Sequence, residues 1–168
     1  MNEPATYKNY FENYTSLVSE KDIITAFANQ NKTLENFCSS ISEEKAEYAY
    51  AAGKWTLKEM LQHIIDTERI FAFRALAIAR KDTVTLPGFD ENIYAANSQA
   101  NKRTWADLVN EMKLVRESTM LLFTSFTTEM LANAGNFSAA TATVNTIGNI
   151  IVGHFFHHVT IANERYFD

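Results

Sequence analysis

Three of the four histidines in the chain lie within five consecutive residues near its C-terminal end: His154, His157 and His158. On an α-helix each residue advances by about 100°, so the side chains of His154 and His158 stand about 40° apart on one face. This spacing is typical of two ligands that bind the same metal ion. His157 also shares a face with His154, about 60° away on the other side. The spacing therefore favours His158 as the second ligand and leaves His157 as the alternative.

The helix face that carries this pair of imidazoles is otherwise apolar. Upstream it holds Ile147, Ile150 and Ile151, and downstream it reaches Ile161. A stripe of this kind points toward a protein core, where an imidazole without a partner is energetically costly. The pattern indicates either surface or hydrogen-bonded histidines or two ligands of a buried metal ion.

His63 is the candidate for a third ligand. It lies in an expected helix, on a polar flank beside the apolar stripe, and such a flank fits the wall of a cavity. Catalytic zinc sites commonly have three protein ligands and an open position, and metal sites in helix bundles form between facing helices. Taken alone, His63 would be interpreted as a surface or hydrogen-bonded histidine. Together with the pair downstream, it predicts a metal site made of His63, His154 and His158.

Asp66 follows His63 by about one helical turn and is the candidate catalytic residue. Its carboxylate can orient an imidazole, ligate the metal or serve as a base on its water. A solvated helix charge is the alternative interpretation. Two adjacent pairs, Glu68-Arg69 and Glu164-Arg165, are interpreted as ion pairs at helix ends without a chemical role.

Apolar residues at three- to four-residue spacing predict four long helices that position these side chains. The expected ranges are 22–40, 56–80, 104–127 and 143–166. The second helix begins at a capping box of Thr56 and Glu59. The first helix includes Cys38, which is interpreted as a buried structural thiol. The inner face of the third helix is read as bulky and unbroken.

The remaining segments are expected to join or cover these helices. Residues 1–20 form an N-terminal helical arm, with an aromatic face that includes Tyr7, Tyr10, Phe11 and Tyr14. A long crossover is expected over 86–101, with a turn at Pro-Gly and a short helical piece after it. Residues 128–142 are read as a connection with a short helix at 129–132. Since no strand signal of comparable length is present, the fold class is predicted to be all-α, a four-helix bundle.

Length and composition limit the remaining possibilities. A chain of 168 residues is expected to form a single domain, 1–168. Its net charge of −5, with scattered basic residues, argues against a nucleic-acid partner. No apolar run approaches the length of a membrane span, so no membrane partner is expected. The single Cys38 and the absence of a recognisable leader predict a cytoplasmic, reducing location.

Four groups of residues resemble the DinB-like (YfiT-like) superfamily of metalloenzymes: Gly53 to Arg69, Leu86 to Glu91, Gly153 to His158, and Glu164 to Tyr166. The resemblance extends from about Tyr7 to Phe167. It implies an up-down-down-up bundle, often a homodimer, with a divalent metal ion, frequently zinc or nickel. In that family one histidine of the second helix and a His-x-x-x-His pair of the fourth hold the metal. These positions fall on His63, His154 and His158, so the resemblance selects His158 over His157.

The same resemblance implies a metal-dependent transferase or hydrolase that acts on a small-molecule substrate. Relatives include S-transferases that use bacillithiol and an isomerase that uses mycothiol, so a low-molecular-weight thiol is an expected co-substrate. Where many relatives carry Gly-His-Glu-Leu-His-His, this chain has Phe155 and Phe156. Any role of that glutamate is therefore missing here, and Asp66 remains the candidate for proton transfer. The alternative is a non-catalytic metal-binding or structural dimeric bundle.

Overall fold

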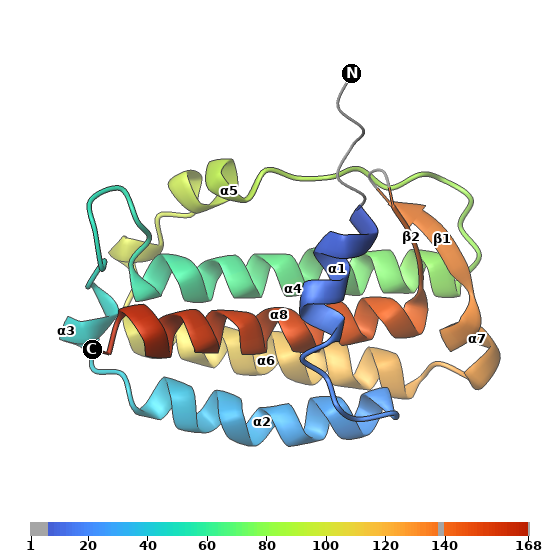
Figure 1. Ribbon diagram of the computed structural model, residues 1–168, viewed down its shortest axis with the longest axis horizontal. Helices are drawn as coiled ribbons and strands as arrows, with labels where there is room; N and C mark the ends of the chain where they lie inside the picture. Colours follow the sequence, from blue (N-terminus) through green and yellow to red (C-terminus); the bar gives the residue numbers. More distant parts are fainter. Residues whose placement is uncertain (1–6, 138–139, 168) are drawn as a thin grey trace.

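Four long helices form a bundle in the computed structural model, which describes residues 7–137 and 140–167 (Figure 1). They are α2 (Ile23–Ser39), α4 (Leu57–Ala79), α6 (Trp105–Thr124) and α8 (Val144–Arg165). Helices α2 and α8 run in one direction, and α4 and α6 run in the other (Figure 1). The bundle therefore has the predicted up-down-down-up topology.

Each long helix begins at a side chain that accepts a hydrogen bond from the first turn. Asp22, Thr56, Thr104 and Thr143 cap α2, α4, α6 and α8 in this way. At the start of α4 the side chain of Glu59 also accepts the backbone N–H of Thr56, which completes the predicted capping box. The predicted starts of the four helices are thus confirmed within one residue.

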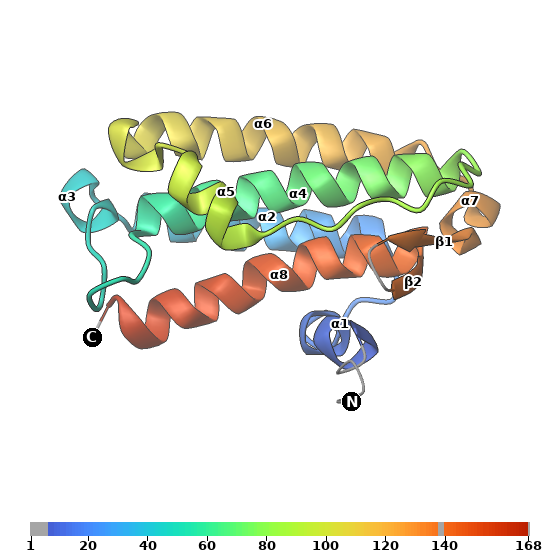
Figure 2. The same ribbon diagram turned by 90° about the horizontal axis from the view of Figure 1, so that it is seen from above.

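Because α4 and α6 run in the same direction, the chain must return along the bundle between them. The segment after α4 does this in an extended course, seen in Figures 1 and 2, and then forms α5 (Glu91–Asn97) and the 3₁₀ turn η1 (Ala100–Lys102). Asp90 caps α5 by accepting the backbone N–H groups of Asn92 and Ile93. The predicted crossover and its short helix are confirmed.

The connection before α8 differs from the prediction. The short helix α7 (Thr128–Ala132) is present, but it is followed by a hairpin of β1 (Ala134–Phe137) and β2 (Ala140–Thr143), which the sequence did not indicate. Each strand has four residues, too few for an alternating pattern to stand out. Gly135 allows β1 to lie close to α4, because a Cβ there would be 2.6 Å from the Cγ1 of Ile78. A further short helix, α3 (Glu43–Ala46), lies between α2 and the loop before α4.

A buried polar layer crosses the bundle and divides its apolar core into two clusters. We call it the Arg116 layer. The guanidinium of Arg116 (α6) donates to both carboxylate oxygens of Glu68 (α4), over 2.9 and 2.7 Å, and to the amide oxygen of Gln30 (α2). Gln30 in turn donates to the carbonyl of Val152 in α8 over 2.5 Å. All four long helices are joined at this level.

The Arg116 layer corrects two expectations from the sequence. Glu68 does not form a helix-end ion pair with Arg69, since its carboxylate is buried against Arg116. The inner face of α6 is not unbroken, because Arg116 lies within it and is 1% exposed. The other predicted ion pair, Glu164-Arg165, is not formed either. Arg165 donates to the hydroxyl of Tyr50 over 3.2 Å, and the ion pairs among the side chains that the structure describes do not include Glu164.

The apolar cluster on the α3 side of this layer includes Cys38, Leu61, Met112 and Phe155, and the other includes Phe27, Phe71, Phe123 and Ile151. Burial raises the pKa of Cys38 to about 12, so this thiol stays protonated, as expected for a structural cysteine. No helix in the described part of the chain is long and apolar enough to cross a membrane.

The N-terminal helix α1 (Tyr7–Thr15) lies across α8 (Figures 1 and 2). The close approach requires Gly153, where a Cβ would be 2.0 Å from the backbone oxygen of Tyr14. The predicted packing of the arm on the bundle is confirmed for this helix. Residues 1–6 and the side chains of Tyr7 and Tyr10 lie outside the described residues.

Candidate metal centre

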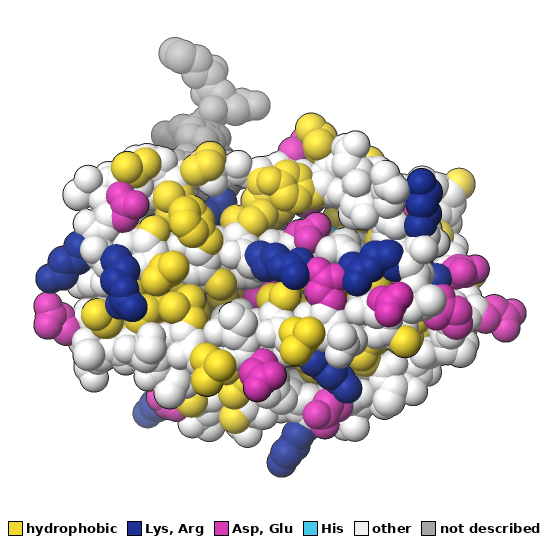
Figure 3. Space-filling view, turned by 180° about the vertical axis from the view of Figure 1, so that it is seen from behind, with side chains coloured by type: hydrophobic (Ala, Val, Ile, Leu, Met, Phe, Trp, Pro, Cys, Tyr) yellow, Lys and Arg dark blue, Asp and Glu magenta, His cyan; other side chains and the backbone are white. Residues whose placement is uncertain are grey.

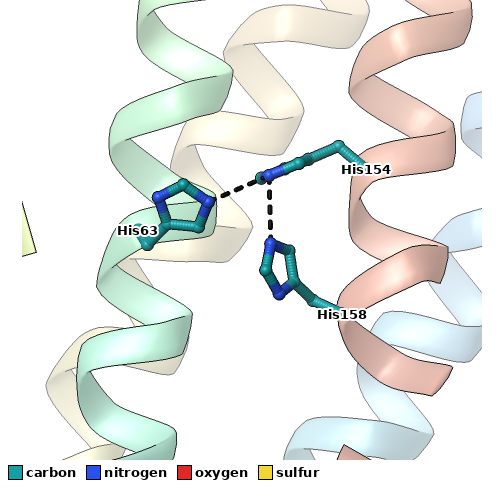
Figure 4. Close-up of side chains that lie close together, drawn as sticks. All are labelled: His63, His154 and His158. Atoms are coloured by element: carbon teal, nitrogen blue, oxygen red, sulfur yellow. Dashed lines mark hydrogen bonds between the residues drawn. The ribbon is translucent and has the colours of Figure 1, made fainter. Parts of the chain in front are cut away.

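Three histidines from two helices point toward one another inside the bundle (Figure 4). His63 comes from α4, and His154 and His158 come from successive turns of α8. The Nε2 atom of His154 lies 3.0 Å from Nε2 of His63 and 3.1 Å from Nε2 of His158. One nitrogen from each of the three residues lies within 4.8 Å of the other two. We call these three residues the histidine group.

The geometry of the histidine group fits a divalent ion. Two nitrogens that each lie about 2.0–2.1 Å from a tetrahedral ion are about 3.4 Å apart, close to the two separations of 3.0 and 3.1 Å from Nε2 of His154. Hydrogen bonds alone satisfy the group poorly, because a ring nitrogen offers either one N–H or one lone pair. Nε2 of His154 faces two other such nitrogens at once. A cation at their meeting point would use the lone pairs of all three.

Burial keeps these imidazoles in the neutral form that binds metal. It lowers the pKa of His63 to about 4, with a smaller contribution from the nearby His157. Burial, followed by the effect of the neighbouring histidines, lowers the pKa of His154 and His158 well below the usual value. Near pH 7 the three rings are therefore uncharged, and their lone pairs are available to an ion.

A nitrogen of the histidine group itself is among the buried polar atoms without a hydrogen-bond partner. Within the described residues, such atoms are Oδ1 of Asn31, Oγ1 of Thr67 and Nδ1 of His158. Thr67 lies four residues after His63 and therefore faces the same side of α4. Ligating histidines usually donate their second N–H to a carboxylate, a carbonyl or a water, and no described residue provides such an acceptor for His158. Two unpaired atoms near one site indicate space for water or a ligand there.

Two aromatic side chains cover the group from outside the bundle helices. The ring of Tyr14 in α1 packs edge-on against His154, with ring centroids 5.3 Å apart. The ring of Trp55, just before α4, lies 4.9 Å from that of His63. The arm and the loop before α4 thus keep bulk water away from the imidazoles, which are 6–9% exposed.

The remaining histidine does not join the group. His157 is half-buried, and its ring stacks edge-on against Tyr14 at 5.4 Å and next to His158 at 5.1 Å. The only group of three or more potential metal ligands within the described residues consists of His63, His154 and His158. The structure therefore brings together the three residues that the sequence selects and leaves His157 at the rim.

Asp66 is also outside the histidine group. Its Oδ1 accepts a hydrogen bond from the side chain of Gln62 over 2.9 Å and lies 4.0 Å from the guanidinium of Arg69. Arg69 and Arg103 both pair with Glu111 of α6, so Asp66 belongs to a polar network between α4 and α6. Burial raises the pKa of Asp66. Its predicted role in proton transfer stays a prediction, because the structure gives it no contact with the imidazoles.

The surface over α6 has a mixed character. In the view from behind the bundle, basic and acidic side chains lie next to one another with hydrophobic side chains between them (Figure 3). A hollow of about 640 Å³ on this side is lined by Arg69, Arg103 and Glu111, and by no histidine. Although this hollow is large, it lies away from the candidate chemistry.

The sequence reasoning missed the two aromatic covers and the Arg116 layer. In the sequence, Tyr14 is part of the aromatic arm and Trp55 is part of the motif from Gly53 to Arg69. Nothing in their spacing connects either residue to a histidine. A signal for the layer was available. Glu68 falls on the apolar stripe of α4, seven residues after Leu61, and Arg116 falls on that of α6, seven residues before Phe123. Charges on two facing apolar stripes indicate a buried ion pair.

A four-helix bundle with a buried group of three histidines is the class of protein that these observations define. The family assignment follows from the sequence: the model of the DinB superfamily matches residues 26–162, and the chain belongs to that superfamily.

Solved structures share the fold. YfiT from Bacillus subtilis, described as a probable metal-dependent hydrolase with an unusual four-helix bundle topology, superposes with a TM-score of 0.68 and 13% identity. The match covers 98% of this chain and 90% of YfiT. YjoA, a DinB-like protein from the same organism, has a TM-score of 0.56 and 19% identity over 83% of this chain and 87% of its own. A search of curated proteins finds no match.

Proposed function

We propose that this protein is a metal-dependent enzyme that presents water or a small thiol as a nucleophile to an electrophilic small molecule. The observation that carries the proposal is the convergence of three neutral Nε2 atoms in the core, from His63, His154 and His158. No carboxylate or thiolate belongs to this group within the described residues. The charge of a divalent ion held there would remain uncompensated by its protein ligands.

When bound there, a divalent ion lowers the pKa of a water or thiol in its open position and so supplies a nucleophile near neutral pH. The residues of the chain have three tasks in this account. The buried imidazoles hold the ion because they stay neutral. Tyr14 and Trp55 limit the access of bulk water. The unpaired Oγ1 of Thr67 and Nδ1 of His158 offer hydrogen bonds to a bound molecule.

The comparisons support a hydrolytic reaction only, and the thiol-transfer alternative rests on the sequence resemblance to the DinB-like superfamily. YfiT is described as a probable metal-dependent hydrolase, and at 13% identity its likeness concerns the fold. Zinc and nickel are the proposed ions, since imidazole ligands suit both. The choice of nucleophile, water or a low-molecular-weight thiol, is the part of the proposal that an assay must decide.

The test compares purified protein loaded with zinc or nickel in two assays. One measures hydrolysis of a panel of activated esters, and the other measures conjugation of small thiols with a generic electrophile. Turnover is expected in at least one assay, and His63→Ala, His154→Ala and His158→Ala should each abolish it. His157→Ala is the matched control, because it removes a histidine from the same helix but outside the group. If the three variants turned over substrate as fast as the unsubstituted protein, the proposal would be contradicted.

The competing reading, a non-catalytic metal-binding bundle, makes a different prediction for the same samples. Metal would bind with a stoichiometry of one per chain, but neither assay would show turnover above that of free metal. Such a result would retain the site and reject the enzymatic activity.

A further inference from the structure

A cavity of about 260 Å³ lies at the end of the bundle where the loop before α4, the helix α5 and the end of α8 meet. Figures 1 and 2 show these three segments at the same end of the molecule. Three aromatic side chains contribute to its lining, as do a lysine, an asparagine and a histidine: Tyr50, Trp55, Tyr166, Lys54, Asn92 and His158. The cavity is slightly smaller than typical ligand pockets of about 300–1,000 Å³, so it suits a small molecule or one end of a larger molecule.

This cavity reaches the histidine group. His158 contributes to its lining, and the ring of Trp55, which also lines it, lies 4.9 Å from the ring of His63. A molecule in the cavity would therefore have one end next to the proposed metal ligands. The hollow between α4 and α6 has no such connection.

The aromatic wall is held in place by contacts between the loop and the end of α8. The hydroxyl of Tyr166 donates to the carbonyl of Trp55 over 2.7 Å, and the ring of Tyr166 packs edge-on against that of Tyr50 at 5.0 Å. Arg165 donates to the hydroxyl of Tyr50. Burial, followed by Tyr50 and Glu59, raises the pKa of Tyr166 to about 12, so this hydroxyl remains a donor. The wall is thus formed before a ligand arrives.

The charges around the cavity favour an anion. Among the described residues that line it, none is Asp or Glu, while Lys54 is exposed at its surface. The guanidinium of Arg165 lies 5.5 Å from the centroid of the Tyr50 ring and adds positive charge behind that wall. The charge of Glu59 raises the pKa of Tyr166, but the Glu59 carboxylate accepts a hydrogen bond from the backbone N–H of Thr56.

We propose that this cavity is the substrate pocket of the histidine site and that it takes a small carboxylate with a flat, aromatic body. In this arrangement the aromatic body stacks among Tyr50, Trp55 and Tyr166, the carboxylate pairs with Lys54, and the reacting group faces His158. The inference rests on the proposed function for the identity of the site. It adds the chemical class of the substrate.

The test uses Trp55 as a reporter of binding. Trp55 and Trp105 are the two tryptophans of the chain, and Trp105 is buried elsewhere, where it donates to the carbonyl of Cys38. In a Trp105→Phe background, the fluorescence of Trp55 is titrated with phenylacetate and with its neutral analogue phenylacetamide. The protein is used in its metal-free and zinc-loaded forms. Calorimetric titration of the unsubstituted chain gives the same comparison without the Trp105 substitution.

Phenylacetate is expected to bind about 3- to 10-fold more tightly than phenylacetamide, including in the metal-free protein, because of its charge pairing with Lys54. Lys54→Glu should remove this preference. Lys32→Glu, with the same change of charge on the exposed side of α2, should leave it intact. Equal affinities for the two compounds, or equal effects of the two lysine substitutions, would overturn the proposal.

The two proposals fail in distinguishable ways. The titration requires no turnover, so a carboxylate preference that depends on Lys54 would stand even if the protein proved catalytically inactive. If hydrolysis or conjugation occurs but the preference is missing, the enzymatic proposal stands and the assignment of this pocket is wrong. A preference found only with zinc and unaffected by Lys54→Glu would also overturn it, because the carboxylate would then bind the metal.

Discussion

The bundle contains two buried polar groups a short distance apart along α8, and they differ in how their polar atoms are satisfied. In the Arg116 layer, the charges of Arg116 and Glu68 face each other, and Gln30 connects the pair to the backbone of α8. In the histidine group, the three Nε2 atoms face one another, and Nδ1 of His158 has no partner among the described residues.

This difference indicates a structural role for the Arg116 layer and a functional role for the histidine group. Buried polar groups are normally hydrogen-bonded, and each exception requires an explanation. The Arg116 layer needs nothing from outside the chain, so its role is to hold the four helices in register. The histidine group is incomplete without an additional component, which is the physical basis for expecting an ion there.

Breaking the Arg116 layer should have the largest effect. Arg116→Met leaves the carboxylate of Glu68 buried without its partner, which is expected to lower the free energy of unfolding by about 3–5 kcal/mol. Urea unfolding followed by circular dichroism measures the loss. Arg69→Met is the matched control, because Arg69 is half-exposed and its pairing with Glu111 is expected to contribute about 1 kcal/mol or less.

A second substitution sharpens this test. In the double variant Arg116→Met with Glu68→Leu, both charges are gone and most of the lost stability should return. If the single variant lost less than about 1 kcal/mol, the layer would not have the structural role described above.

Acid should destabilise the metal-free protein through the histidine group. The pKa of His63 is about 4 in the folded chain and about 6.5 when unfolded, so the unfolded state binds more protons between these values. The contribution of neutral His63 to the free energy of unfolding is therefore fully present above pH 6.5 and is lost as the pH falls toward 4. At about 1.4 kcal/mol per pH unit, His63 alone accounts for about 3 kcal/mol. Chemical unfolding at a series of pH values measures the slope.

The control for the acid prediction is His63→Leu, in which the pH dependence between 6.5 and 4 should become shallower. An unchanged pH profile in this variant would show that the acid sensitivity arises elsewhere in the chain.

Zinc should stabilise the folded protein through the same group. At a free zinc concentration 100 times the dissociation constant, the gain in unfolding free energy is expected to be about 2.7 kcal/mol. His154→Leu should lose this gain and His157→Leu should keep it. Thermal unfolding with and without zinc provides the measurement, and equal gains in both variants would argue against the assigned ligands.

Replacing one histidine of the group in the metal-free protein should have the smallest effect on the free energy of unfolding. His154→Leu replaces a buried, poorly satisfied imidazole with an apolar side chain, so the metal-free variant is expected to be within about 1 kcal/mol of the original chain or more stable. Urea unfolding in the presence of a chelator tests this. A loss as large as that of Arg116→Met would mean that the histidines, like the Arg116 layer, are structural.

Local patterns in the sequence predicted much of the fold and the pair of histidines in α8, whereas the inclusion of His63, 91 positions from His154, rested on the expected packing of facing helices and on the family resemblance. Helical spacing identified the long helices, and capping side chains such as Thr56 marked their starts. The pair of His154 and His158 could be recognised because the two residues are four positions apart and lie on the same face of one helix. These features depend on residues that are close in sequence, so no knowledge of helix packing was required.

The features that were missed depend on which helices become neighbours. Glu68 and Arg116 are 48 positions apart, and their pairing depends on the contact between α4 and α6. Asp66 stands about 60° from His63 around α4, and only the packed structure shows that this turns it toward α6. The cover by Tyr14 similarly depends on where α1 crosses α8, which Gly153 permits.

His63, His154 and His158 are expected to hold one divalent ion together. The most direct test is a crystal structure of the zinc-loaded protein with anomalous scattering recorded on both sides of the zinc absorption edge. A single strong anomalous peak per chain is expected at about 2.0–2.1 Å from each of the three Nε2 atoms. A peak at another set of side chains, or none at this position in fully loaded crystals, would contradict it.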